Sequence, residues 1–168
     1  MKTSTFCFAL MSAVLLSCAP DIEPTEVVLV IDSDLVAPTQ VDSLDVAVFT
    51  AGGEEMNSFA TLGVGDVRFP RTLGVQNINT RLEGYRVEAR ARFGGAIVVT
   101  RTATFDFVRD RSMELRLFLP AACEDVRCEG GLTCTEGGVC RSTDVDLQAW
   151  TGSPSGIQVS LDAGADSM

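Results

Sequence analysis

The residues best suited to chemistry are four cysteines that lie close together in the second half of the chain. They are Cys123, Cys128, Cys134 and Cys140, with four, five and five residues between neighbours. Cysteine thiolates can bind zinc, and paired cysteines can form disulfides. Structural zinc sites use cysteine pairs separated by roughly two to four residues, and only the first gap falls in that range. The spacing therefore favours two disulfides, and we predict no metal and no other cofactor.

Four cysteines can pair in three ways. We favour Cys123–Cys134 with Cys128–Cys140, and a bond between Cys123 and Cys128 would exclude that arrangement. Each favoured bond closes a loop that is worth about 3 kcal/mol of chain entropy. Glycine pairs at 130–131 and 137–138 can form the turns between the sulfur atoms. A segment this rich in cysteine and glycine buries little apolar surface, so the covalent bonds must hold its shape.

The sequence of 168 residues contains no histidine. It therefore offers no Ser-His-Asp or Cys-His catalytic group, no histidine ligand for zinc and no histidine pH switch. A pair of carboxylates can also catalyse reactions, but no motif marks such a pair here. A nucleophile motif and a cofactor-binding loop are missing as well. We expect a protein without catalytic activity.

The charge of the chain is strongly negative, with a formal net value of −10 and an isoelectric point near 4.4. Nucleic-acid binding requires clustered basic residues that neutralise phosphates, so we expect no nucleic-acid partner. Arg86, Arg90 and Arg92 could form an anion-binding stripe. Because they alternate with apolar residues, a solvent-exposed face of a sheet is the favoured interpretation.

A second candidate site consists of Asp32, Asp34, Asp42 and Asp45, which could bind calcium at one end of a β-sandwich. These residues lack the fixed loop spacing of an EF-hand. Solubilising acids at strand ends are the favoured alternative.

The N-terminus has the features of an export signal. Lys2 precedes an apolar run at 6–16 that is too short to span a bilayer. The run ends in Leu-Leu-Ser-Cys at 15–18, which resembles a bacterial lipobox. We predict a lipoprotein signal peptide at 1–17, lipid attached to Cys18 and a tether at 18–25. Ordinary secretory cleavage near Ala19 is the alternative, although Pro20 disfavours it.

This assignment accounts for all six cysteines. Cys7 leaves with the signal peptide, Cys18 carries lipid, and four remain for two disulfides. Stable anchoring needs more than one acyl chain. Export to an oxidising compartment agrees with the disulfide prediction.

The part of the chain between the tether and the cysteines has the periodicity of β-strands. Continuous apolar residues at 27–31 predict a buried strand, and alternation at 44–49 predicts a second one. Strict alternation at 85–93, a Gly94-Gly95 turn and two further apolar stretches up to residue 119 predict three consecutive antiparallel strands. In the return strand, Arg101 interrupts the apolar face.

The remaining stretches before the cysteines show a weaker strand periodicity. Residues 54–65 are predicted as a long loop, and Pro70 indicates an edge strand or a turn into one. We expect about seven strands in a sandwich domain at 26–119, a cysteine-rich disulfide module at 120–141 and an acidic, flexible tail at 142–168. Within the tail, 144–150 and 156–162 alternate weakly, and either could be an edge strand on the sandwich.

Together the lipobox, the sandwich and the cysteine run resemble uncharacterised surface lipoproteins of myxobacteria and related bacteria. The cysteine run is similar to small extracellular EGF-like modules. The resemblance implies an Ig-like (prealbumin-like) antiparallel sandwich followed by a small disulfide-rich module. It also implies attachment to the cell envelope, at the outer membrane or cell surface, through the N-terminal lipid. That family has no assigned activity, so the resemblance adds none.

Two kinds of function follow as expectations. The favoured one is an envelope-anchored lipoprotein with a structural or binding role and an unidentified protein or glycan partner. The alternative is an inhibitor-like or ligand-binding disulfide module, in which Arg127, between the first two cysteines, would contact a protease.

Overall fold

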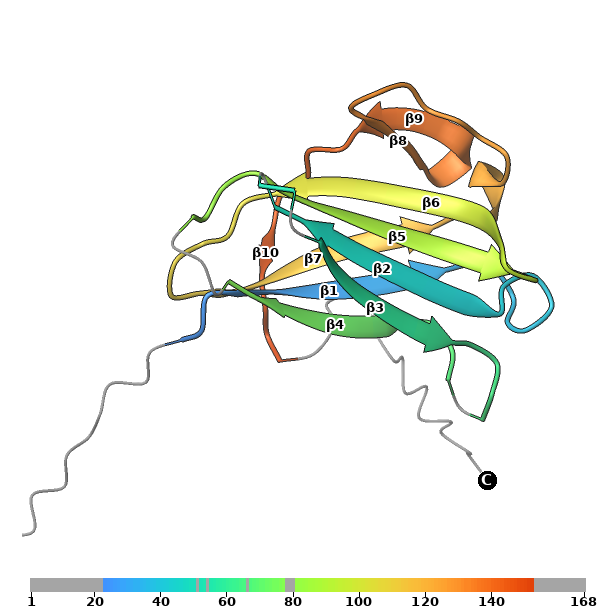
Figure 1. Ribbon diagram of the computed structural model, residues 1–168, viewed down its shortest axis with the longest axis horizontal. Coiled ribbons are helices and arrows are strands. Elements are labelled where there is room, and N and C mark those ends of the chain that lie inside the picture. The colour runs from blue at the N-terminus through green and yellow to red at the C-terminus, as the bar shows by residue number, and fades with distance from the viewer. Residues whose placement is uncertain (1–22, 51, 54, 66, 78–80, 153–168) are drawn as a thin grey trace, which may run out of the picture.

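The computed structural model describes residues 23–50, 52–53, 55–65, 67–77 and 81–152. Within these residues the regular secondary structure is almost entirely β-strand, and two four-stranded sheets pack face to face around one hydrophobic core (Figure 1). The predicted all-β architecture and the sandwich are therefore confirmed. The predicted signal peptide at 1–17, Cys18 and the tether up to residue 22 lie outside the described residues.

In the part of the chain that the structure describes, the elements follow one another without a long helix. They are β1 (Glu26–Ser33), β2 (Ser43–Phe49), β3 (Glu55–Thr61), β4 (Arg71–Gln76), β5 (Tyr85–Phe93), β6 (Ala96–Phe105), β7 (Ser112–Leu119), the 3₁₀ helix η1 (Ala121–Cys123), β8 (Leu132–Thr135), the 3₁₀ helix η2 (Glu136–Gly138), β9 (Val139–Ser142) and β10 (Gln148–Ala149).

Sheet A contains the strands in the order β10-β7-β1-β4, with β1 at its centre. β1 runs antiparallel to β4 and parallel to β7, so that Leu29 lies opposite both Leu73 and Leu115. Five consecutive residues of β1, from Val27 to Ile31, are buried. This burial on both faces is the pattern that the continuous apolar run predicted.

Sheet B contains the strands in the order β3-β2-β5-β6, and all neighbours are antiparallel. In β5 the apolar residues Tyr85, Val87, Ala89 and Ala91 are buried, while the charged residues between them lie on the outer face. Gly94 and Gly95 form the turn to β6 and both have positive φ, as a tight hairpin requires. The alternation therefore predicted the hairpin and its buried face up to Ala91, but not beyond the register shift there, since Phe93 is 45% exposed.

Two predictions about the sandwich are corrected. Residues 55–61 form β3, an edge strand of sheet B, although their weak pattern suggested a loop. β7 does not continue the antiparallel series after β6; it crosses to sheet A and pairs in parallel with β1. Period-two alternation shows which face of a strand is buried, but it contains no information about which strand lies beside it.

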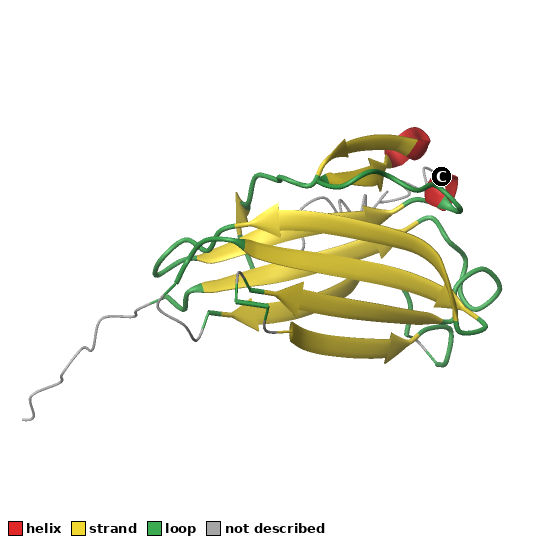
Figure 2. Ribbon diagram, turned by 45° about the horizontal axis from the view of Figure 1, so that its top comes forward, coloured by secondary structure: helices red, strands yellow, loops and turns green. Residues whose placement is uncertain are grey.

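The cysteine-rich segment forms a small module of its own, which we define as residues 120–142 and call the disulfide module. Its β8–β9 hairpin lies along one side of the sandwich, next to β6 (Figure 2). The backbone N–H of Thr102 in β6 donates to the side-chain oxygen of Thr133 in β8, at 2.9 Å. The module therefore packs against the edge of sheet B.

The chain after the disulfide module also contacts the sandwich. Residues 143–149, which we call the C-terminal strap, first bond to Thr104 of β6 and then form β10 beside β7. They cover the edge strands of both sheets on one side of the sandwich. Within the predicted tail, the alternative of an edge strand at 144–150 is confirmed only for residues 148–149, which form β10, and Asp144 forms an isolated parallel bridge with Thr104. The second candidate strand, 156–162, lies outside the described residues.

Candidate functional site

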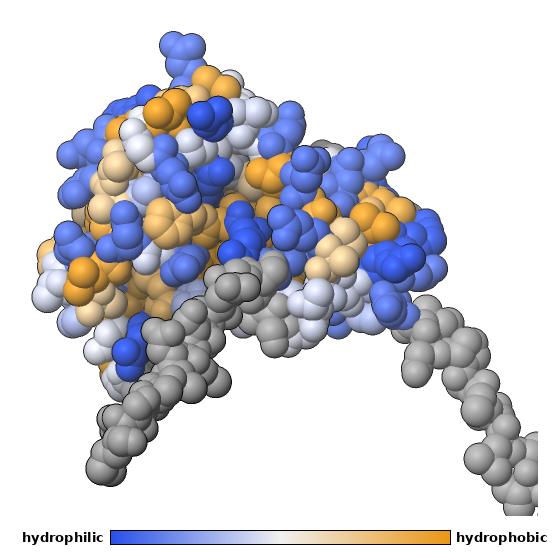
Figure 3. All heavy atoms as spheres, turned by 180° about the vertical axis from the view of Figure 1, so that it is seen from behind, coloured by the Kyte–Doolittle hydropathy of each residue, from blue (hydrophilic) through white to orange (hydrophobic). Residues whose placement is uncertain are grey.

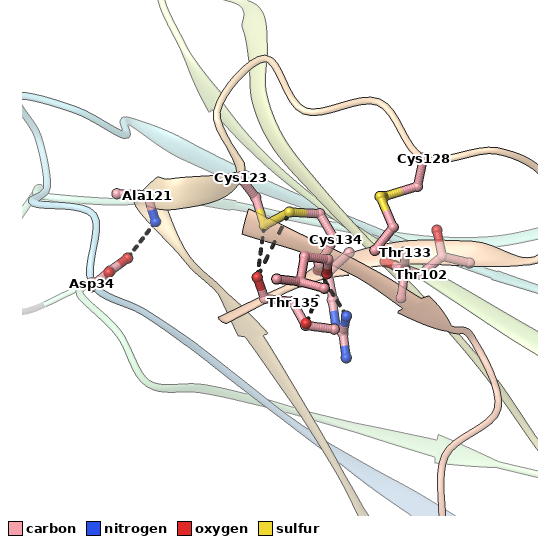
Figure 4. Close-up of a disulfide and its surroundings, with 11 residues drawn as sticks. Asp34, Thr102, Ala121, Cys123, Cys128, Thr133, Cys134 and Thr135 are labelled. Carbon is pink, nitrogen blue, oxygen red and sulfur yellow. Dashed lines mark hydrogen bonds between the residues drawn. A yellow bond between two sulfur atoms is a disulfide. The ribbon is translucent and has the colours of Figure 1, made fainter. Parts of the chain in front are cut away.

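The disulfide module is held by two disulfides, Cys123–Cys134 and Cys128–Cys140, with Cα–Cα distances of 5.8 and 5.7 Å. This is the pairing favoured from the sequence. Cys123 and Cys134 are 3% and 4% exposed and belong to the main hydrophobic core, so the first bond is buried at the contact between module and sandwich. Figure 4 shows that bond and the threonines beside it.

The entry to the module is attached to the sandwich by two short hydrogen bonds. The backbone N–H of Ala121 donates to Asp34 at 2.6 Å, and the hydroxyl of Ser33 donates to the carbonyl of Leu119, also at 2.6 Å (Figure 4 shows the first). Both partners come from the end of β1 and the loop that follows it. The end of β1 therefore determines where the module begins.

Within the module, the two 3₁₀ helices approach each other closely. A Cβ atom built at Gly138 would lie 2.9 Å from the carbonyl oxygen of Ala122, and Gly138 has a positive φ. Glycine is the residue that meets both conditions without strain. This close approach fixes η2 against η1.

A cleft of about 570 Å³ lies between the module and the outer face of sheet A. Its volume falls in the range of small-molecule sites, roughly 300–1,000 Å³. The residues that line it come from β1, β6, β7, β8, η2 and β9: Val30, Asp32, Arg101, Arg116, Leu117, Phe118, Thr135, Glu136 and Arg141. It is the candidate functional site, because it brings together arginines, carboxylates and an aromatic ring.

Arg101 is the most unusual of these residues. Its Nη1 donates to the carbonyl of Cys134 at 2.8 Å, whereas its Nε is buried and has no hydrogen-bond partner among the described residues. Burial lowers the pKa of Arg101, and the nearby negative charge of Glu136 partly offsets this effect. A guanidinium stays protonated at neutral pH, so Arg101 is a fixed and partly desolvated positive charge.

The other two arginines of the cleft differ in their partners. Arg116 donates through Nε to Glu114 at 2.7 Å, and the side chain of Glu114 is only 1% exposed. This ion pair neutralises the charge of a buried carboxylate. Arg141 lies on β9 and is exposed, and it forms no ion pair with another described residue.

The four aspartates of the proposed calcium site do not come together. Asp34 bonds to Ala121, Asp45 forms an ion pair with Arg92, and Asp32 lines the cleft. Asp42 accepts from the backbone N–H of Gly94 at 2.6 Å and from the hydroxyl of Ser43, and these bonds lower its pKa. Among the described residues, no group of three or more potential metal ligands is found.

The arginine stripe of β5 lies on the outer face of sheet B. Arg86 and Arg90 both pair with Glu88, and Arg92 pairs with Asp45. The guanidinium of Arg86 also lies 4.2 Å from the ring centroid of Phe49. These charges are satisfied by neighbours on the same face, in agreement with the solvent-exposed interpretation.

The sequence did not predict the cleft. One signal was available, because Arg101 interrupts the apolar face of its strand. The side chains on either side of it on that face, Val99 and Ala103, are buried, and a cation at such a position requires a polar neighbour. No pattern marked Arg116 or Arg141, since charged residues on the exposed face of a strand are ordinary.

Comparisons with known protein families and with curated proteins find no match for this chain. Among the described residues, none of the helices has the length and hydrophobicity needed to span a membrane. On the face that Figure 3 shows, hydrophobic residues are distributed among hydrophilic ones. What defines the protein at this point is its architecture: an all-β sandwich that carries a disulfide module against one side.

Proposed function

We propose that this protein is an envelope-anchored bacterial lipoprotein with a binding role and without catalytic activity. The observation that carries the binding role is the cleft between the disulfide module and sheet A, since two disulfides hold one wall in place. Disulfides persist in oxidising compartments, which supports export of the chain. The lipobox ending at Cys18 supports attachment to a membrane through lipid.

We further propose that the sandwich is of the prealbumin-like kind. In immunoglobulin constant-type domains the first strand pairs with the second. Here β1 pairs with β4 and β7, and β2 pairs with β3 and β5. This strand order supports the prealbumin-like class over the immunoglobulin class.

Metabolic labelling with a fatty-acid analogue tests the anchor. We expect label on the wild-type chain and none on a Cys18→Ser variant, with the wild type in the membrane fraction. A Cys7→Ser variant is the matched control, because Cys7 lies in the predicted signal peptide and should not affect labelling. An unlabelled wild-type chain would contradict the anchor.

An inhibitor-like module is the second candidate. Arg127 is exposed and lies in the segment between two disulfide-bonded cysteines, Cys123 and Cys128. A segment held at both ends loses little entropy on binding, which favours tight contact with a protease. Inhibition of a trypsin-like protease that disappears in Arg127→Gln would support this candidate, and an unaffected protease panel would count against it.

A further inference from the structure

The cleft contains a positive charge that the described residues leave incompletely satisfied. Arg101 is held by one hydrogen bond to the Cys134 carbonyl, its Nε is without a hydrogen-bond partner, and it forms no ion pair within the described residues. Buried polar groups are normally hydrogen-bonded, and buried charges are normally paired. Because Nε is closed off from solvent, a ligand can meet only the rest of the guanidinium, where a negatively charged acceptor would supply the missing ionic partner.

The carboxylates of the cleft do not replace that acceptor. Asp32 and Glu136 are exposed, so solvent screens their charges, and neither forms an ion pair with Arg101. Glu114 is already paired with Arg116. Because electrostatic interactions are stronger at partly desolvated sites, the fixed charge of Arg101 dominates over the two exposed acids. A ligand with a single negative charge therefore suits Arg101, because the two acids are too well screened to oppose it.

The remaining lining indicates the shape of the ligand. Phe118 lies on the sheet side of the cleft, beside Asp32 in the register of β7 and β1, and is half-buried. A partly exposed aromatic ring can stack against a flat apolar or sugar ring. Arg141, on the module side, can contact the negative group from solvent.

From these observations we propose that the cleft binds a ring-shaped ligand bearing one carboxylate, which Arg101 and Arg141 hold while Phe118 contacts the ring. A guanidinium binds a carboxylate through parallel N–H···O bonds, a geometry that lysine cannot reproduce. Both an aromatic acid and a sugar acid have this chemistry. The inference deepens the binding role proposed above and is independent of lipid at Cys18.

The test is calorimetric titration of the purified full-length chain in detergent. The probes are benzoate and glucuronate, each compared with an uncharged counterpart, benzyl alcohol and glucose. We expect one acid or both to bind with a Kd of about 1 mM or below and the counterpart at least about 10-fold more weakly. Binding of benzoate alone would identify an aromatic acid, and binding of glucuronate alone a sugar acid. If neither acid binds more tightly than its counterpart, the proposal is wrong.

Variants connect the binding to the cleft. Arg141→Gln changes an exposed residue and should weaken binding about 10-fold, as should Arg101→Lys, which keeps the charge but loses the planar donor group. Arg109→Gln is the matched control, because Arg109 is also an exposed arginine but does not line the cleft. If Arg101→Lys does not fold, the test rests on Arg141→Gln. Unchanged binding of the acid by that variant would overturn the proposal. The result of the titration does not depend on lipid at Cys18. The lipid anchor and the binding of a carboxylate can therefore each be refuted without the other.

Discussion

Arg101 lies at a position that the alternation of β6 assigns to the core, between the buried residues Val99 and Ala103 on the same face. A cation in the interior of a sandwich would carry a large desolvation penalty. It is tolerated here because β6 is the edge strand of sheet B and the disulfide module supplies the carbonyl of Cys134. The residue that breaks the pattern therefore identifies the place where a second unit docks.

Asp42 is a second residue with a role beyond its own strand. Its carboxylate accepts from the N–H of Gly94, 52 positions further along the chain, and so connects the start of β2 to the β5–β6 turn. The hydrogen bond to Gly94, followed by that to Ser43, holds its pKa below the ordinary value. A carboxyl group with a lowered pKa in the folded state stabilises the protein above its unfolded pKa of about 3.9.

We therefore predict a pH-dependent effect of Asp42→Asn. The variant should be less stable than the wild type at pH 7, and the difference should shrink as the pH falls below about 4 through the folded-state pKa, because the wild type then loses the same charge. Urea unfolding at neutral and acid pH measures both values. An equal difference at the two pH values would contradict this role for the charge.

Gly138 permits a second prediction at the level of single residues. Gly137 and Gly138 both have positive φ, but only at Gly138 would a Cβ atom meet a neighbouring backbone, the carbonyl of Ala122. Gly137→Ala should cost about 1–2 kcal/mol through the backbone conformation alone. Gly138→Ala should cost more, since η2 must also move away from η1. Equal melting temperatures for the two oxidised variants would show that the close approach is unimportant.

At the scale of elements, the two disulfides close loops of similar length, but they lie in different surroundings. They span 11 and 12 residues, so each contributes about 3 kcal/mol by chain entropy. Cys123–Cys134 is buried in the core, whereas Cys128 and Cys140 are only half-buried. The difference between the two bonds is therefore a matter of packing.

We predict that replacing both Cys123 and Cys134 by alanine destabilises the protein more than replacing Cys128 and Cys140. The excess should be about 1–2 kcal/mol, because only the first pair leaves a buried space next to β6. Chemical unfolding of the two double variants measures it. Equal losses would indicate that chain entropy alone determines the contribution of each bond.

At the scale of the whole molecule, the module and the C-terminal strap protect one side of the sandwich. β6 and β7 are neighbours across the two sheets, and without residues 120–149 both would present unpaired backbone groups. Exposed edge strands promote association between chains. The strap meets β6 through bonds with Thr104 and meets β7 through β10; directly after the strap, the N–H of Trp150 donates to the carbonyl of Ser112.

Truncation tests this role of the strap. A chain that ends after Ser142 should lose about 2–4 kcal/mol of stability, since it loses several backbone hydrogen bonds of about 1 kcal/mol each. It should also self-associate, which size-exclusion chromatography detects. A chain that ends after Gly152 is the control, because it keeps the whole strap. A monomeric short chain with unchanged stability would contradict this account.

Local patterns were sufficient for much of this architecture. Alternation located β5 and its buried face, the apolar run located β1, and the cysteine count and spacing led to two disulfides, whose favoured pairing among the three possible is the observed one. Each of these properties depends on residues close together in the chain, where side-chain periodicity and loop entropy act directly.

The tertiary structure decided everything that depends on partners far apart in the sequence. It placed β7 beside β1 rather than β6, put the module against the edge of sheet B, and closed that side with residues 143–149. The cleft with Arg101, Arg116 and Arg141 exists only because three strands and the module meet there. Such contacts are selected by the total burial and hydrogen bonding of the folded chain, a sum that no local stretch of sequence contains.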